Sequence, residues 1–358
     1  MIFCEDCFKD REVVSMIQSL NNKGNCELVS SHRDVLICNS EDTDTLDSIR
    51  IFINQILDLY TVESKLSQDF PKNKKYLLKD SLEKKWSVFN INSEKIDELL
   101  EYLFEDDSSI EEDIFNEKVG ILAEYDVSYA DKFILKDNDW SKFVETITYG
   151  NRYHTNTINL NLLKKFIGYK QMVIKCSDRK KYYRGRVSLE EEYTKNDMYS
   201  PPKGKASAGR LNPEGISVLY LTDKEQACYQ EIRASFNDSV YIGEFELTRD
   251  VKIVDFRNFE YISLNSEVDA LEYYLNRDIL KEISNNLSIP TTGSSKSKDY
   301  IPLQYISDYI KSLDEKFDGI MYKSVMNEGA SNLMLFENDA VSCINVENKR
   351  IRKIIYDV

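Results

Sequence analysis

The hydrophobic pattern of this chain changes from a helical to a strand-like period near its middle. In the N-terminal half, apolar residues recur at helical spacing over 46–60 and again over 96–104. Short runs rich in β-branched and aromatic residues follow at 171–175, 217–222 and 240–247. This change predicts an α+β protein, with a mainly helical N-terminal part and a C-terminal domain of mixed α and β structure.

The length of 358 residues is enough for two or three domains of about 100–200 residues each. We expect a cysteine-bearing, zinc-knuckle-like segment over 1–40 and a helical, acidic domain over 41–150. The mixed α/β domain would cover 151–358. Between residues 94 and 131 there are 14 acidic and two basic residues, a pattern typical of a solvated surface.

Four of the seven cysteines lie in the first forty residues. Cys4 and Cys7 have the C-x-x-C spacing that lets two thiolates reach one zinc ion. A second C-x-x-C is missing, because Val29 stands three positions after Cys26, so His32 or Cys38 would have to supply a fourth ligand. We predict a structural zinc on Cys4, Cys7, Cys26 and His32, with buried thiols that bind no metal as the alternative.

The overall charge of −15 argues against a nucleic-acid-binding protein, which needs a broad basic surface. Residues 170–214 nevertheless hold 11 basic and six acidic side chains. Arginine side chains and exposed loop amides in such a stretch suit a diphosphate. A solvated basic surface that balances the acidic half is the alternative.

Several classes of protein are disfavoured by what the sequence lacks. It has no apolar run of about 20 residues and no signal peptide at its start, which favours a cytoplasmic protein that does not bind membranes. It also has no phosphate-binding loop and no G-x-G-x-x-G motif. With two histidines in the whole chain, any catalysis is expected to use carboxylate, arginine, tyrosine and serine side chains.

A glycine- and proline-rich loop over 201–215 precedes a predicted strand over 217–222 and then a helix. This order brings the phenol of Tyr220 and the carboxylate of Glu231 close to the basic loop. Considered alone, Tyr220 would more often be a core residue and Glu231 a surface carboxylate. Several motifs, however, together resemble the RES domain family in order and spacing: Tyr183–Arg186, Lys205–Arg210, Gly215–Tyr220, Ala227 with Glu231, Tyr300–Gln304, Phe317–Ser324 and Ser331–Phe336.

The N-terminal half is also similar to a known region. Cys4, Cys7, Phe8, Asp10 and Cys26 resemble the HEPN/RES-type N-terminal region that precedes some bacterial RES domains. The RES resemblance implies a fold akin to ADP-ribosyltransferases and a toxin or effector that consumes NAD+, in a toxin–antitoxin or antiphage defence system. The nicotinamide–ribose bond would be cleaved by hydrolysis or phosphorolysis, with NAD+ as substrate and no catalytic cofactor.

The resemblance also implies roles for single residues. Glu231, Arg184 and Tyr220 would be catalytic, with Glu231 stabilising an oxocarbenium-like transition state. The residues expected to bind substrate are Arg210, Ser324, Asn332 and Arg186. Phosphate, an antitoxin or regulatory protein and a second copy of the chain are expected partners, while nucleic acid and membranes are not. The open alternatives are a protein ADP-ribosyltransferase and a catalytically silent nucleotide-binding module.

Overall fold

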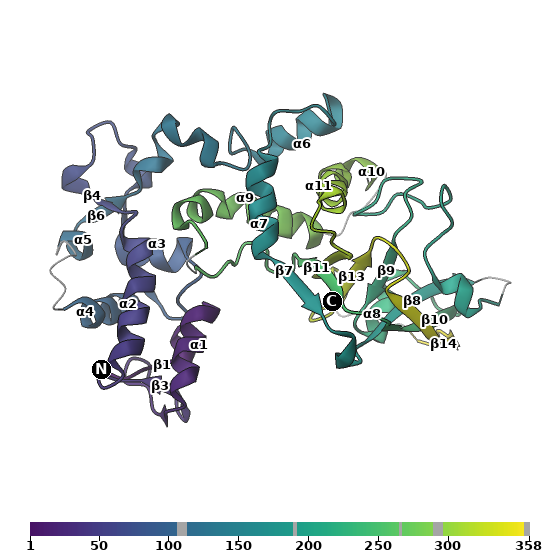
Figure 1. The fold of residues 1–358 in the computed structure, drawn as a ribbon, viewed down its shortest axis with the longest axis horizontal. Helices are drawn as coiled ribbons and strands as arrows, with labels where there is room; N and C mark the ends of the chain where they lie inside the picture. Colours follow the sequence, from purple (N-terminus) through teal and green to yellow (C-terminus); the bar gives the residue numbers. More distant parts are fainter. Residues whose placement is uncertain (106–112, 189–191, 265–266, 289–295, 354–358) are drawn as a thin grey trace. The chain divides into compact units, whose positions relative to one another are not determined.

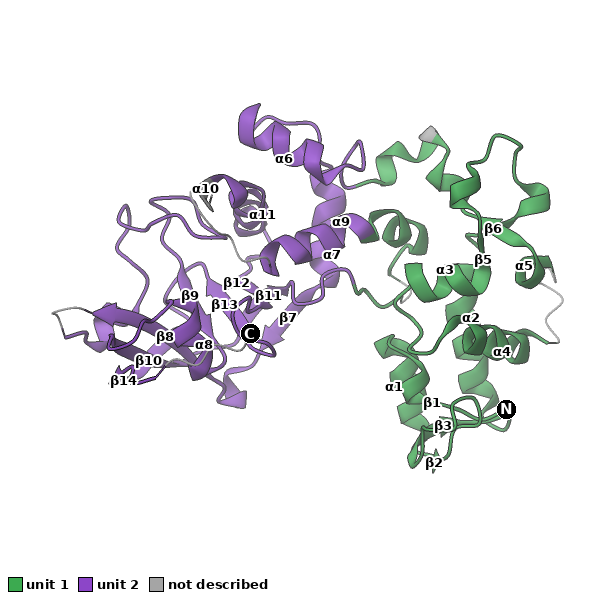
Figure 2. Ribbon diagram, turned by 180° about the vertical axis from the view of Figure 1, so that it is seen from behind, with its two compact units in different colours: residues 1–133, 261–277 green, residues 134–260, 278–358 purple. Residues whose placement is uncertain are grey.

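The computed structural model describes residues 1–105, 113–188, 192–264, 267–288 and 296–353. The chain forms two compact units, one of residues 1–133 with 261–277 and one of residues 134–260 with 278–358 (Figure 2). Helix α9 (Ala270–Ser288) belongs in sequence to both. The domain boundaries expected at residues 40 and 150 stay predictions. None of the described helices is both long and apolar enough to span a membrane.

The first unit is rich in helices, as the periodicity predicts. Its α-helices are α1 (Arg11–Leu20), α2 (Thr43–Leu57), α3 (Leu78–Lys85), α4 (Ser93–Phe104) and α5 (Asp113–Asn116), with the first part of α9. The apolar stripes of α2 and α4 are buried, and the side chains of Asp10 and Asn92 cap the N-termini of α1 and α4. Residues 106–112 of the acidic stretch lie outside the described residues.

Two small antiparallel sheets accompany these helices. The first has the strand order β1-β3-β2, with β1 (Phe3–Cys4), β2 (Lys23–Gly24) and β3 (Val35–Cys38). The second has the order β4-β6-β5, with β4 (Thr61–Val62), β5 (Tyr76–Leu77) and β6 (Lys118–Gly120). Strands of two to four residues are too short to show the alternation that sequence analysis depends on.

The second unit is built on a mixed eight-stranded sheet (Figure 1) with the order β14-β10-β8-β9-β13-β12-β11-β7. The strands are β7 (Gln171–Ile174), β8 (Lys181–Ser188), β9 (Leu219–Thr222), β10 (Ser239–Leu247), β11 (Val251–Asp255), β12 (Gly319–Lys323), β13 (Ser331–Leu335) and β14 (Val341–Arg350). Strands β11 and β12 are parallel, and the other neighbours are antiparallel. The mixed α/β architecture expected for this half is confirmed.

The helices of this unit are α6 (Trp140–Tyr149), α7 (Leu160–Tyr169), α8 (Glu225–Glu231), the second part of α9, α10 (Lys296–Asp299) and α11 (Ile301–Ser312). A small buried cluster of Cys228, Val240 and Ile242 packs α8 onto the sheet. Strands β8 and β9 share a single register pair, Tyr183 with Thr222. Because the two strands part beyond that pair, the sheet leaves room for a site beside Tyr183.

Replacement of Gly319 by alanine tests how closely β12 packs against β13. A Cβ at this position would overlap the main-chain oxygen of Met334 on β13. We expect Gly319→Ala to lower the free energy of unfolding by roughly 1–3 kcal/mol, the usual cost of overpacking. Thermal unfolding of the full chain measures the effect.

Gly168 in α7 is the matched control. No atom lies within 4 Å of a Cβ built there. Gly168→Ala should therefore leave the protein as stable or raise its stability by about 0.5–1 kcal/mol, since alanine favours a helix over glycine. Equal unfolding temperatures for Gly319→Ala and the unaltered protein would contradict the close pairing of β12 with β13.

Candidate functional site

A cavity of about 450 Å3 opens where β8 and β9 part. Its walls come from β8, from β9 and the loop before it, from α8 and the two residues after it, from the residue before α11, and from β12, β13 and the turn between them. Five of the seven residues that the sequence assigns to the site line it: Arg184, Arg210, Tyr220, Glu231 and Asn332. The other residues of the wall are Tyr183, Gly185, Gly209, Leu221, Thr222, Cys228, Ile232, Arg233, Tyr300, Tyr322, Val325 and Met326.

Arg184 is a half-buried cation that has no counter-ion among the described residues. Its Nη1 atom is shielded from solvent and has no hydrogen-bond partner within the described residues. Burial, followed by repulsion from Arg186, lowers the pKa of Arg184 to about 10, so the side chain remains charged at neutral pH. A buried guanidinium without a partner is costly unless an anion pairs with it. The cavity is therefore suited to an anionic ligand.

Glu231, the last residue of α8, is held through one of its two carboxylate oxygens. Its Oε1 atom accepts hydrogen bonds from Ser324 Oγ at 2.7 Å and from Asn332 Nδ2 at 2.8 Å. Within the described chain, its Oε2 atom receives no hydrogen bond. The carboxylate is thus fixed in direction while one oxygen stays available to a ligand.

Ser324 does not line the cavity itself, but its contacts fix Glu231. Its hydroxyl accepts hydrogen bonds from the main-chain N–H groups of Met326 at 3.3 Å and Asn327 at 3.2 Å, and it donates to Glu231. The Asn327 side chain in turn donates to Gln230 Oε1 at 2.7 Å. The turn between β12 and β13 is therefore fastened to the end of α8 at two adjacent residues.

The ring of Tyr220 lines the cavity, whereas its hydroxyl is bonded within the protein. The hydroxyl donates to Asn212 Oδ1 at 2.8 Å and accepts from the main-chain N–H of Leu211 at 3.1 Å. Burial raises the pKa of Tyr220 well above its usual value. The phenol is therefore protonated at neutral pH, and its proton is engaged with Asn212.

The two remaining arginines differ in their surroundings. Arg210 lines the cavity, donates from Nη1 to the main-chain oxygen of Asn286 at 2.8 Å, and lies 5.5 Å from the centre of the Tyr300 ring. Arg186 does not line it. Its guanidinium donates to the main-chain oxygen of Asp197 and lies 4.6 Å from the centre of the Tyr193 ring.

Sequence reasoning did not single out Asn212, Gln304, Arg233 or Tyr322. Asn212 and Gln304 are buried and bond the loop that carries Arg210. Tyr322 and Arg233 lie in the cavity wall. Asn212 stands before a proline in the glycine- and proline-rich loop, and Gln304 ends the motif at 300–304. The sequence thus marked both positions, but it did not indicate which groups their side chains bind.

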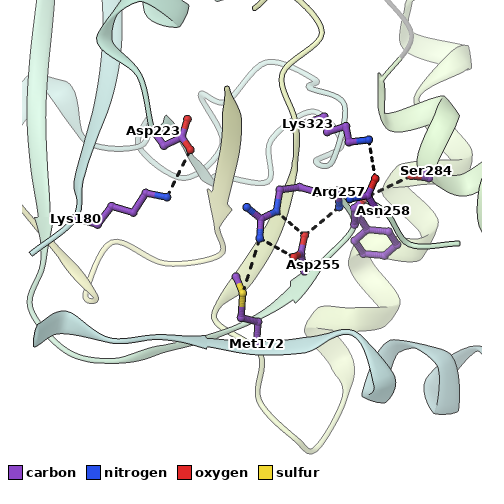
Figure 3. A network of polar contacts seen from close by, with 9 residues as sticks. Met172, Lys180, Asp223, Asp255, Arg257, Asn258, Ser284 and Lys323 are labelled. Atoms are coloured by element: carbon purple, nitrogen blue, oxygen red, sulfur yellow. Dashed lines mark hydrogen bonds and ion pairs between the residues drawn. The ribbon is translucent and has the colours of Figure 1, made fainter. Parts of the chain in front are cut away.

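A network of polar contacts lies at the ends of β9 and β11 (Figure 3). Asp223 exchanges main-chain and side-chain hydrogen bonds with Ser331, the residue before Asn332, and its Oδ2 atom lies 3.5 Å from Lys180 Nζ. Arg257 forms a two-pronged ion pair with Asp255, with N···O distances of 2.9 and 2.7 Å. The pKa of Asp255 is lowered, because its bonds with Arg257 outweigh the effect of burial. None of these residues lines the cavity.

A second site lies in the first unit, where Cys4, Cys7, Cys26 and His32 meet. Their ligand atoms all lie within 4.8 Å of one another. The Sγ atom of Cys7 lies 3.6 Å from that of Cys4 and 3.7 Å from that of Cys26, and Cys4 Sγ lies 3.2 Å from His32 Nδ1. Thiolates around tetrahedral zinc, with Zn–S bonds of about 2.3 Å, lie about 3.8 Å apart. The cluster could therefore hold a structural zinc.

The turn at Cys26 keeps a ligand geometry although its second cysteine is missing. The main-chain N–H of Val29 donates to Cys26 Sγ at 3.3 Å, and His32 fills the fourth position instead of Cys38. Hydrogen bonding from Cys7 lowers the pKa of Cys4 to about 6, which favours a thiolate at Cys4, whereas the bond with Cys4 and burial raise the pKa of Cys7. Residues 4 to 32 thus supply a complete ligand set for one ion.

Comparison with known proteins agrees with the C-terminal motifs from Gly185 onward, whereas Tyr183 and Arg184 lie before the matched range. A model of the RES domain family matches residues 185–356, so the chain contains a RES domain over this range. No curated protein and no solved structure matches the chain. The family match does not extend into the N-terminal half, and the resemblance of that half to a HEPN/RES-type region stays a prediction.

Replacement of Cys26 by serine tests the metal centre. We expect about one zinc ion per chain in the unaltered protein, and much less in Cys26→Ser because a hydroxyl is a poor zinc ligand. The metal content is measured by mass spectrometry after gel filtration. Cys38→Ser is the matched control, since Cys38 is equally buried but lies outside the cluster. Equal zinc contents in the two variants would contradict the assignment.

Proposed function

We propose that the RES domain cleaves the nicotinamide–ribose bond of NAD+, with water or inorganic phosphate as the acceptor. The observation that carries this proposal is that a carboxylate and a guanidinium line the same cavity without forming an ion pair with each other. Glu231 is a carboxylate fixed through one oxygen, and Arg184 is a half-buried guanidinium that has no counter-ion among the described residues. A dinucleotide that carries a diphosphate and a ribose fits both. Membership of residues 185–356 in the RES family supports the same substrate.

Glu231 would act on the ribose. Cleavage of an N-glycosidic bond passes through a state with positive charge on C1′ and the ring oxygen. The Oε2 atom of Glu231 would accept a hydrogen bond from a ribose hydroxyl, and the carboxylate charge would stabilise that positive charge. Because Ser324 and Asn332 already hold Oε1, little reorganisation would be needed when the charge develops.

The leaving group explains why no strong acid is needed in the cavity. The nicotinamide nitrogen of NAD+ carries a positive charge, so the C1′–N bond breaks with its electron pair moving onto nitrogen, and nicotinamide departs neutral. Attack of water or phosphate oxygen on C1′ then forms the new bond and releases any proton of the nucleophile to solvent. Tyr220, whose proton is bonded to Asn212, is not required as a general acid.

The arginines would bind the diphosphate. Arg184 and Arg210 both line the cavity, and Arg233 lies two residues after Glu231 in the same wall. Guanidinium groups form two-pronged bonds with phosphate oxygens. An anion at Arg184 would satisfy the Nη1 atom that the described protein leaves without a partner.

The setting that we propose is the bacterial cytosol, where a toxin or defence effector that drains NAD+ would need restraint. Either an antitoxin protein or the N-terminal half, with its HEPN/RES-like motifs, would provide it. Full-length protein that is no less active than its isolated C-terminal unit would exclude the N-terminal half as the restraint.

Glu231→Gln tests the chemistry. We expect nicotinamide release from NAD+ to fall by about 100- to 1,000-fold, the usual loss when one preorganised electrostatic group is removed. Binding of ADP-ribose should stay within a few-fold, because the amide removes a negative charge near the diphosphate. Chromatography with mass detection measures both substrate loss and products. The product identifies the acceptor: ADP-ribose for water, its phosphorylated form for phosphate, and modified protein for a transferase.

Glu225→Gln is the control for this experiment. Glu225 lies on the same helix, but it pairs with Lys349 and Tyr229 and does not line the cavity. Its variant should release nicotinamide at the unaltered rate. Binding of NAD+ without release by the unaltered protein would instead favour the silent module or an enzyme held inactive by its N-terminal half, and the isolated C-terminal unit distinguishes the two.

Arg184→Gln tests the anion site, with Arg186→Gln as its matched control from the same strand. Loss of the buried charge at Arg184 should raise KM for NAD+ and Kd for ADP-ribose by roughly 10- to 100-fold, since hydrogen bonds to charged groups contribute about 1.5–3 kcal/mol. Arg186 is bonded outside the cavity, so its variant should change neither constant by more than about threefold. Unchanged constants in Arg184→Gln would contradict the anion site. A rise in Arg186→Gln equal to that in Arg184→Gln would support the predicted role of Arg186 in substrate binding.

A further inference from the structure

We propose that Asn212 and Gln304 are positioning residues that set the place of Arg210 in the cavity, and through it the affinity for the anionic part of the substrate. This inference rests on the proposed function only in that it names the substrate. The structural basis is a loop that hydrogen bonds hold at three points around Arg210. We call residues 207–212 the arginine loop.

Asn212 closes the loop on itself and on β9. Its side chain is 3% exposed. The Nδ2 atom donates to the main-chain oxygens of Ser207 at 3.1 Å and Ile216 at 2.9 Å, while Oδ1 accepts the Tyr220 hydroxyl at 2.8 Å. Both ends of the amide are therefore engaged, as burial of such a group requires.

Gln304 fastens the same loop to α11. Its side chain is 6% exposed, and Nε2 donates to the main-chain oxygens of Gly209 at 2.8 Å and Asn212 at 3.0 Å. These two residues lie on either side of Arg210. The main-chain N–H of Leu211, between Arg210 and Asn212, donates to the Tyr220 hydroxyl. The backbone around Arg210 is thus held from α11 and from β9.

The fit leaves no room for adjustment at Gly209. A Cβ there would overlap Asn212 Oδ1 and would lie 2.8 Å from the Tyr220 hydroxyl. The guanidinium of Arg210 lies over the ring of Tyr300, the residue before α11. Residues 300–304 therefore contact both the side chain of Arg210 and the backbone beside it. Without the amide of Gln304, the main-chain oxygen of Gly209 would lose this donor, and that of Asn212 would keep only the N–H of Gly209. The arginine loop would then lose both of these bonds to α11.

The consequence for the enzyme separates binding from chemistry. Arg210 lines the cavity, while Glu231 is held by Ser324 and Asn332 from the turn after β12 and from β13. The hydrogen bonds of Asn212 and Gln304 do not involve these residues. A loosened arginine loop should therefore weaken ligand binding and leave the rate constant of bond cleavage almost unchanged.

A double-mutant cycle tests this inference on the full chain. The variants are Gln304→Met, which keeps the size and loses the donor, Arg210→Ala, and the two combined. Calorimetry gives Kd for ADP-ribose, and nicotinamide release gives kcat and KM. We expect Gln304→Met to raise Kd and KM by about 5- to 20-fold with kcat within threefold. In the Arg210→Ala background, Gln304→Met should have no further effect.

Tyr220→Phe is the second variant, in case Gln304→Met fails to fold. It keeps the ring and removes the hydroxyl that holds Asn212 and Leu211. Its effect on Kd should be smaller, about 3- to 10-fold, and it should also vanish in the Arg210→Ala background.

Ser307→Ala is the control for these variants. Ser307 is buried one turn after Gln304 on α11, and its hydroxyl has no partner in the described chain.

The outcomes separate this inference from the proposed function. Effects of Gln304→Met that persist undiminished in the Arg210→Ala background, or that fall on kcat with Kd unchanged, would overturn the positioning role. Binding of ADP-ribose without nicotinamide release, by the unaltered protein and by its isolated C-terminal unit alike, would overturn NAD+ cleavage but not the role of the loop. Failure of the unaltered protein to bind ADP-ribose would overturn both.

Discussion

The close packing of α8 on β8 determines how the cavity is built. Gly185 on β8 faces α8, and a Cβ there would lie 3.1 Å from Ile232 Cδ1 and 3.2 Å from Cys228 Cβ. A larger residue would push the helix away from the sheet. Because the helix sits so close, its last residue, Glu231, reaches the same cavity as Arg184, which immediately precedes Gly185. In the described chain no ion pair joins the two, so both charges remain available to a ligand.

The parts of the fold with a long hydrophobic period were predictable from the sequence. The stripes over 46–60 and 96–104 correspond to α2 and α4, and the run at 240–247 corresponds to β10. The short strands of the first unit were not predictable, because strands such as Phe3–Cys4 have no period of their own. Phe3–Cys4 is a strand because it pairs with β3, which lies more than thirty residues later in the sequence.

The site shows a similar division. Motif order identified Arg184, Tyr220 and Glu231, which the structure gathers in one cavity. It also assigned Arg186 to substrate binding, although Arg186 does not line the cavity that Arg184 reaches. Nor could it reveal the partners of Gln304, since the carbonyl groups that it binds lie more than ninety residues away. Such side-chain pairs depend on how α11 and the arginine loop meet, which no local pattern records.

The spread of these residues along the chain gives the protein an order of assembly during translation. The cysteine and histidine ligands lie between residues 4 and 32, so the ribosome releases them early. The cavity, in contrast, needs residues from Tyr183 to Asn332, and β9 has no neighbour on one side until β13 emerges. A nascent chain, or a product of premature termination before residue 331, would lack that wall and the amide that holds Glu231. Under the proposed function, the cell's dinucleotide pool would be safe from unfinished copies of the enzyme.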